Sequence, residues 1–187
     1  MTNNKIILGL VGPIASGKGA FCQYFKSRHQ AEILRFSTVL RDVLDRFYIE
    51  QSRENMQALS SALRQIFGDD LLAKTMADDV AKSPAKIIVL DGIRRLPDIK
   101  YLKESPNFHL VEITADQQVR FERIISRKEN TDDAKKTFAE FQNDEKQEAE
   151  LQIKEVAQAA KFHILNNGTI ENLHDQIDII LKKLGAS

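Results

Sequence analysis

Short apolar runs alternate along the chain with longer stretches in which apolar residues recur at helical spacing. The runs predict β-strands at 6–11, 31–36, 86–90, 109–113 and 162–165. The amphipathic stretches predict helices at 17–29, 37–47, 53–67, 69–81 and 116–127, then a long helix through about 157 and a closing helix at 171–184. Ser37 is expected to cap the second of these helices. Mostly apolar strands are typical of parallel sheets covered on both faces. Strands alternating with helices predict one α/β domain with right-handed crossovers.

Composition and charge exclude several classes of protein. The 187 residues carry 27 Lys plus Arg and 27 Asp plus Glu, and a net charge of zero argues against a nucleic-acid partner. One cysteine, Cys22, cannot form an internal disulfide, and its helical surroundings predict a small buried apolar role. No apolar run approaches the ~18 residues of a membrane span, and the first residues lack a signal-peptide pattern. We therefore expect a cytoplasmic protein with no membrane partner; the oligomeric state stays open.

The first predicted strand runs directly into a glycine-rich loop, G-P-I-A-S-G-K-G-A. Its pattern G-x-x-x-x-G-K, placed between a strand and a helix, is typical of a phosphate-binding loop. Backbone N–H groups and the helix N-terminus would face the phosphates, and the lysine would place a positive charge on them. We expect the loop to bind ATP through Gly12, Pro13, Ile14, Ala15, Ser16, Gly17, Lys18, Gly19 and Ala20.

The loop departs from the usual pattern where a Ser or Thr hydroxyl normally holds Mg²⁺. Gly19 follows Lys18, and Ala20 follows Gly19. Magnesium readily keeps several of its waters, so these waters can be held by other side chains. The candidates are Ser16, Ser37 and Asp91. The alternative is a weakened nucleotide binder without catalysis.

Two features after the loop are candidates for binding an acceptor. On the 53–67 helix, Arg53, Gln57, Ser60 and Arg64 share the face opposite the apolar stripe and could grip a phosphate, although an ordinary solvated face explains them as well. Asp91 ends a buried strand, at the sheet edge where open α/β folds bind ligands. It could hold the magnesium shell or accept the acceptor's proton, and the nearby Arg94 could reach a phosphate.

These segments resemble known kinases. The G-K-G of the loop is similar to that of adenylate kinase and related nucleoside monophosphate kinases, which carry a threonine where Ala20 stands. L-R-F-S-T-V-L-R, S-R-E-N-M-Q and V-L-D-G-I-R-R-L-P-D resemble segments of phage deoxynucleoside monophosphate kinases, with one additional residue between the aspartate and the arginine. The resemblance implies a P-loop NTPase fold with a five-stranded parallel sheet flanked by helices, and an acceptor-binding helical region at about 37–82. It implies an acceptor site formed by Phe36, Ser37, Arg41, Arg53, Arg64 and Arg94.

The later part of the chain resembles the lid region of such kinases. F-E-R-I-I-S-R is similar to the R-x-x-x-R at which the adenylate kinase lid begins, which implies that Arg123 and Arg127 clamp the transferring phosphates. The alternative is surface arginines paired with neighbouring glutamates. A helical lid is expected at about 128–150, although this acidic stretch could also be a solvated excursion. The turn Asn166-Asn167-Gly168 lies where such kinases bind adenine, so Asn167 and Gly168 join the expected ATP site; a plain left-handed turn is the alternative.

Together these features predict an ATP-dependent phosphotransferase with Mg²⁺ as cofactor and a (deoxy)nucleoside monophosphate as its small-molecule acceptor. The expected catalytic residues are Lys18, Asp91, Arg123 and Arg127. One alternative is a kinase for another small acceptor, such as dephospho-coenzyme A. Another is a nucleotide-binding or ATP-hydrolysing regulatory module, for which Ala20 is the best argument.

Overall fold

The computed structural model describes residues 5–127, 137–145 and 148–186. The strands are β1 (Ile6–Val11), β2 (Glu32–Arg35), β3 (Ile87–Asp91), β4 (Phe108–Thr114) and β5 (Phe162–Leu165). The helices are α1 (Lys18–His29), α2 (Phe36–Arg46), α3 (Arg53–Phe67), α4 (Leu71–Lys82), α5 (Gln117–Arg127), α6 (Phe138–Asp144), α7 (Glu148–Ala157) and α8 (Ile170–Lys183), with a 3₁₀ turn, η1, at Leu96–Ile99.

The five strands form one parallel sheet in the order β2-β3-β1-β4-β5. Strand β1 is central, and the register pairs Val11 with Glu112 on β4 and Gly9 with Leu90 on β3. In a parallel sheet, all strands deliver the loops that follow them to the same edge. The loop after β1, the aspartate that ends β3 and the turn after β5 therefore share one edge, as predicted.

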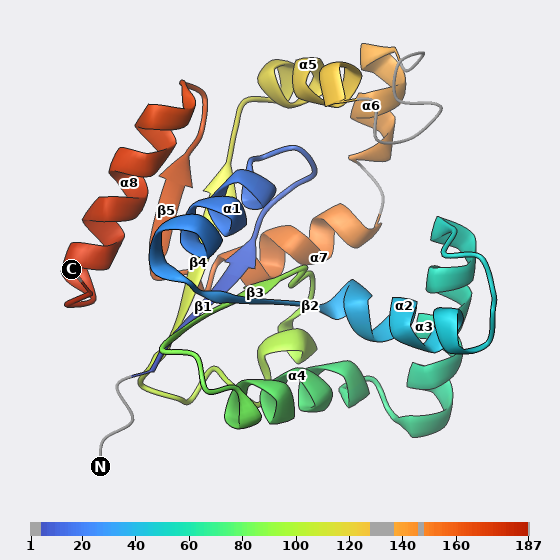
Figure 1. Ribbon diagram of the computed structural model, residues 1–187. Helices are drawn as coiled ribbons and strands as arrows, with labels where there is room; N and C mark the ends of the chain where they lie inside the picture. The colour runs from blue at the N-terminus through green and yellow to red at the C-terminus, as the bar shows by residue number, and fades with distance from the viewer. Residues whose placement is uncertain (1–4, 128–136, 146–147, 187) are drawn as a thin grey trace.

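Helices cover both faces of the sheet (Figure 1), and on each face a layer of buried apolar side chains packs between helices and strands. On one face, Phe21 and Phe25 of α1 pack with Leu173 and Ile177 of α8 against β1, β4 and β5. On the other face, α2, α4 and α7 pack against β1 and β3. Helices α2 and α3 extend to one side of the sheet, while α5 and α6 lie beyond its carboxyl edge (Figure 1). These two groups of helices flank the edge that carries the phosphate loop.

Several helices begin at capping side chains. The hydroxyl of Ser52 accepts the N–H of Asn55 at 3.1 Å at the start of α3. Thr137 and Glu140 cap α6 reciprocally, which satisfies two N–H groups that the helix itself cannot. No helix in the described ranges is long and apolar enough to span a membrane.

Two expectations were wrong in detail. Helix α2 begins at Phe36 and follows an extended Arg35, so Ser37 lies inside its first turn and does not cap it. The long helix expected through residue 157 is two helices, α6 and α7. Helix α6 starts at the Thr137 cap and ends at Asp144, whereas α7 packs its apolar face on β1 and β4. The single helix expected here is therefore two helices with different packing partners.

Candidate functional site

The loop between β1 and α1 requires glycine at two positions. Gly12 has a φ of +149°, and a Cβ there would lie 2.1 Å from the carbonyl oxygen of Ile113. Gly17 has a φ of +112°, and its Cβ would lie 2.1 Å from Nδ2 of Asn166. Any side chain would clash with β4 or with the turn after β5. The two glycines of the motif thus let the loop lie directly against its neighbours.

The ammonium group of Lys18 is bound within its own loop. Its Nζ donates to the carbonyl oxygen of Gly12 at 2.7 Å and to that of Pro13 at 2.8 Å. These two bonds keep a positive charge beside the loop backbone. A phosphate bound there would meet this charge without a large movement of the chain.

Three further loop carbonyls are held from other elements. Arg120 Nη1 on α5 donates to Ile14 O at 3.4 Å. Arg123 Nη1 donates to Ala15 O at 3.5 Å. The buried Asn166, after β5, donates through Nδ2 to Ser16 O at 2.8 Å. Five consecutive carbonyls, at residues 12–16, are therefore engaged by side-chain donors.

These side-chain hydrogen bonds to the loop carbonyls also fix the directions of the loop N–H groups. In a trans peptide the C=O and N–H groups point in opposite directions. Holding the carbonyls of Ile14 and Ser16 therefore turns the N–H groups of Ala15 and Gly17 to the other side. Gly17 also begins α1 without a side-chain cap, and the first turn of α1 carries no acidic residue. The free N–H groups at the start of α1 and the positive end of its dipole make this end of the helix suited to an anion.

Ser16, Ser37 and Asp91 were the candidates to hold magnesium waters in place of the missing hydroxyl, and they differ in burial and in position. Ser16 is fully buried, and its Oγ has no hydrogen-bond partner among the described residues. Gly19 is exposed, and a Cβ added to it would meet nothing within 4 Å, whereas Ala20 packs against the apolar layer under α1. Ser37 is half-buried in α2. The loop therefore offers no exposed hydroxyl directly after Lys18.

Asp91 stands at the end of β3, close to the phosphate loop. Its carboxylate lies 3.2 Å from Nε of Arg35, the last residue of β2. Burial raises the pKa of the Cys22 thiol on α1 to about 12; the Asp91 charge adds to this shift, while the charges of Arg35 and Lys18 oppose it. Asp91 ends β3, the strand paired with β1, and Lys18 follows the loop after β1, so the carboxylate and the loop lie at the same end of the sheet. The raised pKa also fits the inert role expected of Cys22.

The described residues fit a magnesium ion held mostly by water and phosphate. They contain no group of three or more His, Cys, Asp or Glu side chains that could enclose a metal. Asp91 supplies a carboxylate at the carboxyl edge of the sheet, at the end of the strand paired with β1. A single carboxylate together with substrate phosphates and water is the usual protein environment of Mg²⁺. The donor set therefore suits Mg²⁺ brought with a nucleotide, with Asp91 as the protein group that would hold its shell.

A cleft of about 590 Å³ lies between α3 and the segment that follows β3. It is lined by Ser61, Arg64, Gln65, Asp69 and Arg95. Burial lowers the pKa of Arg64, and the nearby positive charge of Arg95 lowers it further. The Nε of Arg64 is buried and has no hydrogen-bond partner among the described residues. Two arginines at one cleft, one with an unused donor, form a site suited to an anion.

The segment that carries Arg94 and Arg95 is fixed by one buried carboxylate. Asp98 accepts the backbone N–H of Arg94 at 2.9 Å and that of Arg95 at 3.0 Å. The Arg95 guanidinium lies between Asp98, at 3.5 Å, and Asp69, at 3.8 Å. Gly92, with a φ of +98°, lets the chain pass close to Phe36 at the start of α2. Phe36 and the backbone of Arg94 therefore lie at this turn, and Arg64 lines the neighbouring cleft together with Arg95.

Other expected residues are placed elsewhere. The exposed Arg41 donates to Gln51 Oε1 at 2.7 Å, in the connection between α2 and α3. Asn167 accepts the backbone N–H of Asp116 through Oδ1 at 2.7 Å, and Gly168 precedes the cap of α8. The side chains of Arg53 and Arg127 lie outside the described part, as do residues 128–136 and 146–147 of the expected lid. Their roles stay predictions.

Three residues near the site were not expected from the sequence: Arg35, Arg95 and Arg120. Arg35 ends β2 as Asp91 ends β3, but the strand predicted at 31–36 placed that end at Phe36. Arg120 stands three residues before Arg123, on the same side of α5. Arg95 lies beside Arg94, and only the fold shows that its guanidinium lines the cleft.

Comparisons with known proteins agree with this architecture. Residues 11–142 match the family described as "AAA domain". A UPF0200 protein of Saccharolobus islandicus is 29% identical over 170 residues, covering 89% of this chain and 87% of the relative. A UPF0200 protein of Methanothermobacter thermautotrophicus is 24% identical over 182 residues, covering 97% of this chain and 92% of the relative.

Solved structures show the same fold at low sequence identity. TT1252 from Thermus thermophilus has a TM-score of 0.64 at 16% identity, covering 96% of this chain and 98% of that one. Shikimate kinase from Bacteroides thetaiotaomicron has a TM-score of 0.61 at 13% identity, with the same coverage. The fold is that of P-loop kinases, a nucleotide-binding architecture. From the match over residues 11–142, the chain belongs to the AAA domain family.

Proposed function

We propose that this protein is an ATP-dependent phosphotransferase that moves the γ-phosphate of ATP to a small phosphorylated acceptor, with a (deoxy)nucleoside monophosphate as the leading candidate. The observation that carries the proposal is that the phosphate loop with Lys18 follows β1, while Asp91 ends β3, the strand paired directly with β1. A phosphate-binding lysine beside a strand-end carboxylate is the arrangement that phosphoryl transfer requires.

In this proposal the loop binds the donor. The amides of Ala15 and Gly17 and the ammonium of Lys18 would bind the β- and γ-phosphates. Mg²⁺, when bound, would neutralise charge between these phosphates, and Asp91 would hold the waters of its shell. Because phosphoryl transfer depends mainly on positioning and charge, these groups suffice for the donor half of the reaction.

The cleft beside α3 would bind the acceptor. Arg64 and Arg95 both line this cleft, and the buried Nε of Arg64 has no hydrogen-bond partner among the described residues. Guanidinium groups bind phosphate through paired N–H donors, so an acceptor that already carries a phosphate fits better than a neutral one. The family resemblance of Arg64 and Arg94 to acceptor-binding arginines supports a nucleoside monophosphate in particular.

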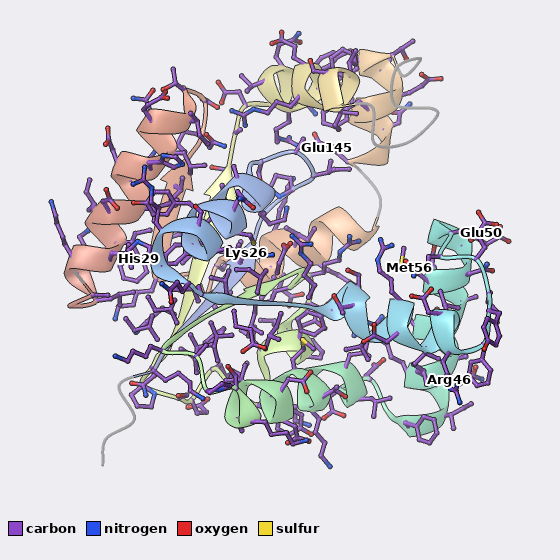
Figure 2. The ribbon with its side chains drawn as sticks, viewed as in Figure 1. Lys26, His29, Arg46, Glu50, Met56 and Glu145 are labelled. Atoms are coloured by element: carbon purple, nitrogen blue, oxygen red, sulfur yellow. The ribbon has the colours of Figure 1, made fainter. Side chains whose placement is uncertain are left out.

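The decisive test is ADP release from Mg-ATP with the common ribo- and deoxyribonucleoside monophosphates and dephospho-coenzyme A as acceptors. The Lys18→Ala protein serves as the blank, and Lys26→Ala, an exposed lysine on the same helix, serves as the matched control (Figure 2). We expect release that depends on Lys18 and on one or a few nucleotides.

Acceptor-independent ATP hydrolysis would instead favour a regulatory module, which Gly19 and Ala20 support because they leave no exposed hydroxyl for the metal. Release with dephospho-coenzyme A alone would identify the other small-acceptor kinase.

A further inference from the structure

One buried side chain, Arg120 of α5, contacts both the phosphate loop and the end of helix α6. Arg120 is 6% exposed. Its Nε donates to Ala115 O at 2.9 Å, and its Nη1 donates both to Ile14 O in the loop and to Glu145 Oε1 at the end of α6. Figure 2 shows Glu145 at the end of α6 nearest the loop. One guanidinium thus contacts the loop and the helix at once.

Helix α6 packs on α5 through aromatic contacts and through polar contacts, and Arg120 takes part in both. The Arg120 guanidinium lies 5.4 Å from the centre of the Phe141 ring, which is fully buried. Phe121 of α5 contacts the rings of Phe138 and Phe141 at 5.2 Å and 5.8 Å. Gln117 also binds Glu145 and receives a bond from Gln142 at 3.0 Å. Helix α6 therefore rests on α5 through aromatic rings and through a polar group centred on the Arg120–Glu145 pair.

Arg120 contacts the loop next to Ala15, a residue with an unusual backbone conformation. Ala15 has a φ of +59°, a conformation that a residue with a Cβ seldom adopts. The carbonyls on both sides of its Cα, those of Ile14 and Ala15, are held by Arg120 and Arg123. The bond to Ile14 O orients the peptide that carries the Ala15 N–H, one of the amides assigned to phosphate. Displacing Arg120 would leave this amide free to turn away.

We propose that Arg120 is a positioning residue that couples the position of α6 on α5 to the conformation of the phosphate loop. Glu145, which binds Arg120 and Gln117, thereby sets the affinity of the loop for ATP. The inference rests on the proposed nucleotide-binding role of the loop. The Arg120–Glu145 pair is largely buried, with side chains 7% and 16% exposed. Removing the Glu145 charge leaves a buried guanidinium without its counter-ion, and the guanidinium then shifts toward water and away from Ile14. Coupling is reciprocal, so bound ATP must also hold α6 in place.

The test is a double-mutant cycle on ATP affinity. The proteins are wild type, Glu145→Gln, Arg120→Lys, the double variant, and Asn143→Ala as a control with an exposed side chain on the same helix. Calorimetric Kd values for ATP are measured, with circular dichroism to establish folding. We expect Glu145→Gln to weaken binding by about 5- to 20-fold, Arg120→Lys by a similar factor, and the double variant by no more than the larger of the two. Asn143→Ala should bind like wild type.

Hydrogen exchange supplies a readout that a purely structural role would not move. ATP should slow amide exchange in α6 of the wild type and of Asn143→Ala, and should do so much less in Glu145→Gln. Wild-type affinity in Glu145→Gln, or additive losses in the double variant, would overturn the coupling while leaving the proposed function intact. A wild-type protein that fails to bind ATP at all would overturn both.

Discussion

The carboxylate of Asp91 and the Nε of Arg35 lie 3.2 Å apart, on residues that the sheet register places side by side at the ends of β3 and β2. The Arg35 side chain is 50% exposed and that of Asp91 is 18% exposed. The pair faces the edge of the sheet that carries the phosphate loop, so a metal ion approaching Asp91 must compete with a guanidinium.

Replacing Asp91 by Asn should separate catalysis from binding. We expect kcat for phosphotransfer to fall by ~100-fold or more, because the magnesium shell loses its carboxylate, while the Kd for ATP changes little. Steady-state kinetics and calorimetry measure the two quantities. Glu112→Gln is the matched control, since Glu112 is a strand carboxylate paired with His163 at 2.7 Å. Retention of full kcat in Asp91→Asn would remove Asp91 from the site.

Replacing Arg64 by Gln should affect the acceptor rather than ATP. A charged hydrogen bond to phosphate contributes about 1.5–3 kcal/mol, so we expect the KM for the acceptor to rise by ~10- to 100-fold with the KM for ATP unchanged. Arg46→Gln, an exposed arginine near the end of α2, is the control (Figure 2). An equal rise in both KM values would indicate general damage to the fold instead of a lost acceptor contact.

Gly19 allows a direct test of the missing hydroxyl. A Cβ at this position meets nothing within 4 Å, so Gly19→Ser and Gly19→Ala should both fold, each with slightly better helix propensity than glycine. Only the serine restores a hydroxyl next to Lys18. We expect the Mg²⁺ concentration for half-maximal ADP release to be lower for Gly19→Ser than for Gly19→Ala. Identical magnesium dependence in the two variants would show that the hydroxyl position is irrelevant here.

The thiol of Cys22 should be inert and should make stability depend on alkaline pH. Its pKa rises from 9.0 to about 12, first because of burial and second because of Asp91. The stability from the protonated thiol is fully present below pH 9 and is lost between pH 9 and about 12, because only the unfolded state releases the proton there. Native labelling by a thiol reagent at pH 8 should be ~1000-fold slower than in urea.

The pH effect can be isolated with Cys22→Ala. We expect the difference in unfolding free energy between wild type and this variant, measured by urea denaturation, to be smaller at pH 10.5 than at pH 7.5. Other alkaline groups, such as Tyr24, titrate in both proteins and cancel. A pH-independent difference would mean that the native thiol ionises normally.

Local pattern was sufficient for most of the fold and for part of the site. The apolar run at Ile6–Val11 and the loop after it predicted β1 and the start of α1 to within one residue, because a buried parallel strand and a glycine motif leave few alternatives. The same local rules failed at Ser37, where β2 runs directly into α2, and between α6 and α7, where packing on different neighbours decides.

Two of the unexpected residues, Arg120 and Arg35, act through a partner far away in the sequence. Arg120 binds Ile14, 106 residues earlier, and Arg35 binds Asp91, 56 residues later. Periodicity in one helix says which face is apolar, but it does not say which loop a charged side chain will reach. Motif positions such as Lys18 are exceptions, since the loop itself supplies their partners.

The two hydrogen bonds from Lys18 to loop carbonyls, at 2.7 Å and 2.8 Å, also disfavour the binding of weakly charged ligands. A ligand that draws the ammonium away must replace both contacts, so a neutral hydroxyl or a single weak acceptor gains nothing by entering the loop. Neighbouring oxygens of a polyphosphate carry enough charge to compensate. The loop should therefore discriminate by charge density before any base or sugar is recognised, and inorganic triphosphate should compete with ATP far better than adenosine does.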